Sequence, residues 1–241
     1  MNISFLSNCA KLAVESYDDI GTVRVRIESD VGGYVEIVDG EDDIAYVVFR
    51  GSDELRDWLL NARMNLVPYA GGKVHAGFLA HYMSLRDNLF NELAKKRNRE
   101  IIFVGHSLGA IGGIFCAVDQ RLDALECRGT KIVTFGGPRV GDAAFAAAFR
   151  EKVSSCTWDC IRVENAEDCI PTLPIRYHHP ITRRLIMDRR GGFVFKEGGD
   201  PPKKWSFVSP LASFIPCDRR WDITAHFHNE YHRRLTFMLK N

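Results

Sequence analysis

One segment of this 241-residue chain constrains its fold more than any other: EIIFVGHSLGAIGGIFCAVDQ, residues 100–120. β-Branched and aromatic residues, typical of a buried strand, lead into Gly-His-Ser-Leu-Gly, and small apolar residues of helical character follow. This order predicts a sharp strand-to-helix turn that carries Ser107. The serine backbone is strained in such a turn, and side chains at Gly105 or Gly109 would collide there. We therefore expect the Ser107 hydroxyl to stand at a helix N-terminus, above the end of a sheet.

The pattern of the remaining chain fits a parallel sheet. Apolar runs at 101–105, 131–137 and 160–165 are separated by segments of helical length and spacing. Strands that alternate with helices are typical of βαβ units, so we expect a mostly parallel central sheet with helices on both faces. Two amphipathic helices are predicted from apolar stripes, which are Tyr82, Leu85, Leu89 and Leu93, and, near the C-terminal end, Phe227, Tyr231, Leu235 and Met238.

No linker or internal repeat interrupts this pattern, so we expect residues 1–241 to form one domain. Residues 176–220 differ from the rest, because prolines, glycines and charges are scattered there and one hairpin is expected. This region holds ten Lys or Arg and four Asp or Glu, a net charge of +6. It is either a basic surface for an anionic membrane or, as we favour, a solvated hairpin.

The composition of the chain argues against several classes of protein. A net charge of +1 provides no field for nucleic acid or another polyanion. No apolar stretch is long enough to span a bilayer, and the first residues lack the basic region of a signal peptide. Seven cysteines, an odd number with no Cys-x-x-Cys pair, suggest neither a disulfide framework nor a zinc site. We therefore expect a cytoplasmic protein, and any contact with a membrane would be peripheral.

Ser107 needs partners before it can act as a nucleophile. A serine hydroxyl is weakly reactive unless a base removes its proton and an acid orients that base. After a turn of this kind, the acid and then a histidine follow the serine along the chain. Asp168 stands just after the predicted strand at 160–165 and is the acid that we favour. Glu167 beside it and Asp142 after the preceding strand remain alternatives.

The candidate bases are the histidines that follow the acid, which are His178, His179, His226, His228 and His232. The first two are too close to Asp168 for another strand to intervene, and the last two fall within the predicted C-terminal helix. His226 precedes that helix, and a loop or first turn leaves its ring free to face Ser107. The sequence therefore predicts a triad of Ser107, Asp168 and His226.

Taken in order, these motifs resemble the class 3 lipases, the fungal-type branch of the α/β-hydrolases, from about Ala45 to Leu235. The blocks that carry the resemblance are VVFRGSDELRDWLLN, KVHAGFLAHY, FVGHSLGA, TFGGPRVGDAAFA, RVENAEDCIPTLP and DITAHFHNEY. The resemblance implies an α/β-hydrolase fold. It also carries the nucleophile, acid and base of the family onto Ser107, Asp168 and His226, the residues that the spacing favours.

The resemblance implies two further parts of a site. Its FRGS block puts an oxyanion-hole amide at Ser52, and the Leu108 amide is the second donor. Residues 53–61 fall where a short amphipathic lid is expected, although a fixed surface helix would suit the same charges. The apolar residues that would cover the site are Leu55, Trp58 and Leu59.

The function implied by the resemblance is hydrolysis of a lipid carboxylic ester, a triacylglycerol or a related acylglycerol, through an acyl-enzyme. This mechanism needs no metal and no organic cofactor. The expected partners are the lipid ester and, peripherally, a lipid interface or membrane. A soluble carboxylesterase or a phospholipase A-type enzyme is the alternative. A catalytically silent lipase-like binding module is a third possibility, because a fold does not guarantee chemistry. The sequence gives no indication of an oligomeric state.

Overall fold

A computed structural model describes residues 1–18, 24–30, 32–51, 65–96, 99–198 and 226–240. Within these ranges, eight strands form one sheet in the order β1-β2-β3-β6-β7-β8-β9-β10. The strands are β1 (Arg24–Glu28), β2 (Tyr34–Asp39), β3 (Ile44–Phe49), β6 (Glu100–His106), β7 (Gly129–Phe135), β8 (Asp159–Asn165), β9 (Arg184–Met187) and β10 (Phe193–Lys196). Neighbours run parallel from β3 to β9 and antiparallel at both outer ends, so the predicted mostly parallel sheet is confirmed.

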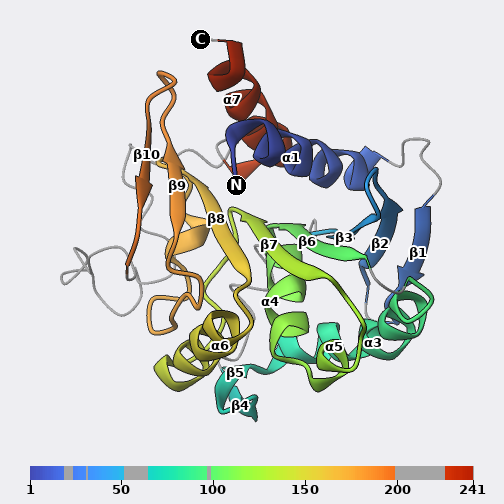
Figure 1. Cartoon of the computed structure of the whole chain (residues 1–241). Helices are drawn as coiled ribbons and strands as arrows, with labels where there is room; N and C mark the ends of the chain where they lie inside the picture. The colour runs from blue at the N-terminus through green and yellow to red at the C-terminus, as the bar shows by residue number, and fades with distance from the viewer. Residues whose placement is uncertain (19–23, 31, 52–64, 97–98, 199–225, 241) are drawn as a thin grey trace.

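Helices cover both faces of this sheet, as Figure 1 shows. One face carries α1 (Ile3–Asp18) and α7 (His228–Lys240), and the other carries α3 (Ala76–Leu93), α4 (Ala110–Val118), α5 (Gln120–Asp123) and α6 (Ala143–Ser155). Two short 3-10 turns, η1 (Ser107–Gly109) and η2 (Ile170–Thr172), follow β6 and β8. A separate ribbon pairs β4 (Leu66–Tyr69) with β5 (Gly72–His75). This layered arrangement is the α/β-hydrolase architecture that the sequence predicts.

The central strands are apolar on both faces because each face has its own core. On β6, Ile101 and Phe103 belong to the core beneath α3 and α4. Their neighbours Ile102 and Val104 belong to the core beneath α1 and α7. Successive side chains of a strand point to opposite faces, so a single strand supplies both cores.

The helical stripes predicted from the sequence are confirmed with one exception. Tyr82, Leu85, Leu89 and Leu93 are buried on α3. On the C-terminal stripe, Tyr231 and Leu235 are buried in α7 and Met238 packs against the same core while half-buried, whereas Phe227 is 52% exposed. Phe227 lies before the first residue of α7, so the helical spacing does not apply to it. The N-terminal helix α1, which the sequence-based expectations lack, packs beside α7 on the same face.

The hairpin expected within residues 176–220 is formed by β9 and β10 at one edge of the sheet (Figure 1). Several of its basic side chains have acidic partners. Arg183 contacts Asp159 at 2.7 Å, and Arg184 lies 3.6 Å from Glu164. These ion pairs reduce the net positive charge that this part of the region presents to a membrane. The remainder, from residue 199 to 220, lies outside the described residues.

Candidate active site

Ser107 stands where β6 ends and η1 begins, directly before α4. Its φ of +59° lies in the left-handed region, which is strained for a residue with a side chain. The two flanking glycines permit this turn. A Cβ on Gly105 would lie 2.3 Å from the Gly109 carbonyl oxygen, and a Cβ on Gly109 would lie 2.2 Å from the Phe49 carbonyl oxygen. The strained strand-to-helix turn predicted from the sequence is therefore present.

Asp168 and His226 converge on this serine from different parts of the fold. Asp168 lies in the loop after β8, and His226 lies just before α7. His226 Nε2 lies 2.9 Å from Ser107 Oγ, and His226 Nδ1 lies 2.8 Å from Asp168 Oδ2. An ionised carboxylate only accepts hydrogen bonds, so Nδ1 carries the ring proton and Nε2 is free to accept the serine proton. All three side chains are buried.

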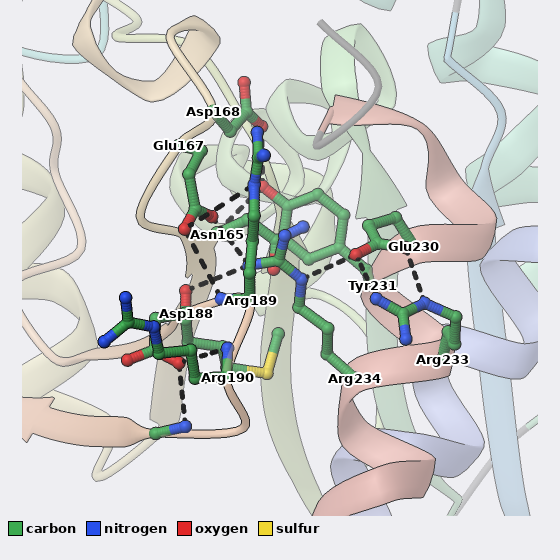
Figure 2. Close-up of polar contacts among 12 residues, drawn as sticks. Asn165, Glu167, Asp168, Asp188, Arg189, Arg190, Glu230, Tyr231, Arg233 and Arg234 are labelled. Atoms are coloured by element: carbon green, nitrogen blue, oxygen red, sulfur yellow. Dashed lines mark hydrogen bonds and ion pairs between the residues drawn. The ribbon is translucent and has the colours of Figure 1, made fainter. Parts of the chain in front are cut away.

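The carboxylate of Asp168 is held by two further donors. The Ile170 amide donates to Oδ1 at 2.9 Å. The Tyr231 hydroxyl on α7 donates to Oδ2 at 2.6 Å and accepts from the Asn165 amide at 3.3 Å. Burial and the neighbouring carboxylate raise the pKa of the Tyr231 phenol well above its ordinary value, so its proton stays available for donation. Figure 2 shows Tyr231 directed at Asp168 from α7.

The two alternative acids are engaged elsewhere. Asp142 caps the N-terminus of α6, because its carboxylate accepts from the Phe145 amide at 2.8 Å. Glu167 accepts from Arg234 at 2.8 Å, an ion pair drawn in Figure 2. The geometry therefore singles out Asp168 among the three carboxylates.

The other candidate histidines are also placed away from the serine. His179 is buried with Nε2 at 2.6 Å from the Pro171 carbonyl oxygen. His228 stacks on the Tyr17 ring, with ring centroids 4.1 Å apart. His178 bridges to Gly141, and His232 lies along α7. Of the five histidines after the acid, His226 is the one that contacts Ser107.

The proposed oxyanion donors are described only in part. Leu108 follows the serine at the start of the 3-10 turn, and its side chain is buried. Gly51 runs close to the serine, because a Cβ on Gly51 would lie 3.2 Å from Ser107 Cβ. Ser52 and the lid residues lie outside the described residues. The roles predicted for them therefore stay predictions. These lid residues are Leu55, Trp58 and Leu59.

The described part of the chain offers neither a metal-binding cluster nor a helix that could span a membrane. Within it, no three or more His, Cys, Asp or Glu side chains are grouped so that they could hold a metal ion. None of its helices is both long enough and apolar enough to cross a bilayer.

Comparisons with known proteins identify lipases as relatives of this chain. The family model "Lipase (class 3)" matches residues 46–178, more than half of the chain. A lipase of Rhizomucor miehei is 34% identical over 154 residues, which cover 60% of this chain and 41% of that protein. The secreted mono- and diacylglycerol lipase A of Penicillium camembertii is 30% identical over 154 residues, 61% of this chain and 48% of that protein.

A third relative is a plant protein. The phospholipase A1-II 3 of Oryza sativa subsp. japonica is 28% identical over 221 residues, 74% of this chain and 51% of that protein. The matches to these curated relatives thus span 41% to 51% of their lengths.

A solved structure supports the fold. The Rhizomucor miehei triacylglyceride lipase superposes with a TM-score of 0.71 over 93% of this chain and 92% of that chain. At 23% sequence identity, this likeness concerns the architecture of the chain. The α/β-hydrolase fold predicted from the sequence is confirmed.

The relatives also correct the cytoplasmic location predicted from the sequence, which is wrong on this evidence. The Penicillium relative is described as secreted. Unpaired cysteines do not indicate the compartment of a protein, for a physical reason. Cys9, Cys116, Cys160 and Cys169 are buried thiols, and a buried cysteine packs as a small apolar side chain whatever the compartment.

Proposed function

The chain belongs to the class 3 lipase family, and from this membership we propose that it hydrolyses carboxylic esters of lipids. In this proposal Ser107 is the nucleophile, His226 the general base and Asp168 the acid that orients it. The observation that carries the proposal is the pair of contacts of His226, at 2.9 Å to Ser107 Oγ and 2.8 Å to Asp168 Oδ2. A serine, a base and an orienting acid in this relation are the recurrent arrangement of acyl transfer.

The reaction proceeds in two halves. In the first, Ser107 Oγ attacks the acyl carbonyl while His226 Nε2 takes the hydroxyl proton, and the resulting imidazolium returns that proton to the leaving alcohol. An acyl group is then esterified to Ser107. In the second half, His226 removes a proton from water, the hydroxide attacks the acyl carbonyl, and the Ser107 oxygen leaves with the proton held by His226. The products are the free fatty acid and the resting serine.

The negative charge of the tetrahedral intermediate requires donors at its oxygen. We propose the backbone amides of Leu108 and Ser52 for this role. Leu108 is suited to it because it stands at the N-terminal end of the η1–α4 segment, where amides point away from the helix. Loss of one such donor typically costs about 2.7–4 kcal/mol of transition-state stabilisation.

The substrate class that we propose is an acylglycerol. Two relatives support it, because the names of the Rhizomucor and Penicillium proteins describe enzymes of triacylglycerides and of mono- and diacylglycerols. A phospholipid ester is the second candidate, and the rice phospholipase A1 relative favours it. The two classes differ at the third glycerol position, where a phosphate brings a negative charge.

We further propose that the chain contacts a lipid interface peripherally. The support on the fold is the outer strand β10, on which Phe193, Val194 and Phe195 are each 44–54% exposed. Exposed apolar side chains that gather on one face, as Phe193 and Phe195 do with ring centroids 6.2 Å apart, mark surfaces that meet another apolar phase. Residues 53–61 would act as the lid over the site in this proposal.

The test is a comparison of substrates across the onset of aggregation. We expect hydrolysis of long-chain acylglycerols to rise when the substrate forms droplets or micelles, and to vanish in Ser107→Ala. Ser29→Ala is a matched control, because Ser29 contacts Ser84 at 2.6 Å, outside the Ser107 cluster. Faster turnover of phosphatidylcholine than of acylglycerols would favour the second candidate. Undiminished turnover in Ser107→Ala would contradict the proposal.

A further inference from the structure

His106, the residue before the nucleophile, has no role in the reaction described above. It is buried within the strand-to-helix turn. Its Nε2 lies 2.6 Å from the backbone carbonyl oxygen of His226, and its Nδ1 lies 3.0 Å from the hydroxyl of Tyr17. The His106 ring thus connects the proposed base to a tyrosine on the N-terminal helix α1.

The direction of these two hydrogen bonds follows from the chemistry of the groups. A carbonyl oxygen only accepts, so Nε2 of His106 must carry a proton, and this N–H donates a hydrogen bond to the His226 carbonyl oxygen. Burial, and to a lesser degree the neighbouring His226, lower the pKa of His106 well below its ordinary value. The ring is therefore neutral. A neutral ring protonated at Nε2 presents a lone pair at Nδ1. The Tyr17 hydroxyl therefore donates to Nδ1 and selects this tautomer.

Tyr17 is itself fixed by segments that surround the serine. Its ring stacks on His228, two residues after the proposed base, with an interplanar angle of 3°. The Arg50 guanidinium lies 5.2 Å from the centre of the Tyr17 ring. A Cβ on Gly51 would lie 2.1 Å from the Tyr17 hydroxyl oxygen, so that oxygen touches the backbone just before the proposed donor Ser52. Tyr17 thereby contacts three of the chain segments that meet at the site, which are those before Ser107, after His226 and before Ser52.

We propose that Tyr17 and His106 are positioning residues, which hold the backbone of His226 so that its ring stays in line with Ser107. The proposal rests on the function proposed above. His226 lies between residues 199–225 and α7, and its carbonyl is anchored by the His106 bond rather than by a strand. A displacement of about 1 Å at a reacting group costs up to about 100-fold in rate, so an anchor at this backbone affects turnover directly.

The test compares three variants of the full chain on a soluble short-chain aryl ester. His106→Met removes the donor but keeps the length of the side chain, and we expect kcat to fall about 10- to 100-fold. His106→Gln returns an N–H near the position of Nε2, and most of this loss should be recovered. Tyr17→Phe keeps the ring stacked on His228 and removes only the hydroxyl. For this variant we expect kcat to fall about 3- to 10-fold, with KM changed less than about twofold.

Tyr46 is a matched control for the loss of a tyrosine hydroxyl in the contact between α1 and the sheet. The Tyr46 hydroxyl on β3 contacts Asn8 of the same helix at 3.4 Å. Tyr46→Phe should therefore leave kcat unchanged. A nitrogen NMR spectrum of the wild-type chain should show His106 protonated at Nε2, and a spectrum with the proton at Nδ1 would overturn the proposal.

Kinetic outcomes separate this inference from the proposed function. Equal losses in His106→Gln and His106→Met would show that the ring only fills space, and so overturn the positioning role. Full activity in Tyr17→Phe would remove Tyr17 from the network. Either result would leave the proposed function intact, provided that the wild-type chain turns over esters and Ser107→Ala does not. Loss of that difference would instead contradict the proposed function itself.

Discussion

At the residue scale, the space around the proposed acid is filled so closely that one glycine is required. Gly136, at the end of β7, has a φ of +57°. A Cβ there would lie 2.8 Å from Asp168 Oδ2 and 2.8 Å from the Tyr231 hydroxyl oxygen. These are the two atoms whose hydrogen bond holds the carboxylate in place.

We predict that Gly136→Ala lowers kcat at least about tenfold, because the new methyl group displaces Asp168 and thereby the His226 ring. The strained backbone should also cost about 1–3 kcal/mol of unfolding free energy. Gly198→Ala is the matched control: its φ is +97°, with nothing within 4 Å of a Cβ. It shares the strain but not the collision. Steady-state kinetics and chemical denaturation of both variants check this, and equal kcat in the two would contradict the account.

Some residues of the candidate site can be predicted from the sequence, and others cannot. The spacing of Ser107, Asp168 and His226 along the chain reflects the order of strands, so these residues could be chosen from the sequence. Tyr231 and His106 could not, because their contacts depend on how α7 and α1 dock on the sheet. Nothing in the local pattern around Tyr231 distinguishes it from an ordinary member of an apolar helical stripe.

At the scale of elements, α7 is fastened to the loop of the proposed acid by a buried arginine. Arg234 donates to Glu230 at 2.8 Å on its own helix and to Glu167 at 2.8 Å on the loop after β8. Its side chain is only 5% exposed, whereas Arg233 is 62% exposed. Figure 2 shows both arginines beside Glu230. The two neighbouring arginines therefore differ in burial and in the contact of Arg234 with Glu167.

We predict that Arg234→Met lowers the free energy of unfolding by about 1.5–3 kcal/mol, because it removes the charge-assisted hydrogen bonds that a nearly buried guanidinium donates to the half-buried Glu167 and Glu230. Arg233→Met should cost less than about 1 kcal/mol, as exposed ion pairs usually do. Denaturant titrations of the two variants measure the difference. Similar losses in both would mean that burial of Arg234 does not matter to the attachment of α7.

Elements with a regular apolar period were predictable from the sequence, and others were not. The strands at 101–105, 131–137 and 160–165 stand out as short apolar runs, and the helix α3 repeats its apolar residues every three or four positions. Phe227 breaks the rule because it precedes α7, and its ring faces solvent. The helix α1 was missed although Leu6, Ala10 and Ala13 are buried at intervals of four and three, because polar residues interrupt the run.

At the scale of the whole molecule, the two cores share one sheet. The central strands supply Ile101 and Phe103 to one core and Ile102 and Val104 to the other. If these strands separate, the apolar side chains of both cores are therefore exposed together. We predict that residues 1–241 unfold as one domain, with coincident thermal transitions by near-ultraviolet dichroism and by loss of ester hydrolysis. Two separated transitions would contradict a single folding unit.

In the proposed mechanism, everything depends on Ser107 as a nucleophile made reactive by His226. The most direct measurement is to react the chain with a fluorophosphonate and locate the adduct by peptide mass spectrometry. We predict one adduct per chain, on Ser107, formed at least about 1,000-fold more slowly in His226→Ala. An unmodified Ser107 in a chain that still hydrolyses esters, or an adduct on another residue, would contradict the account.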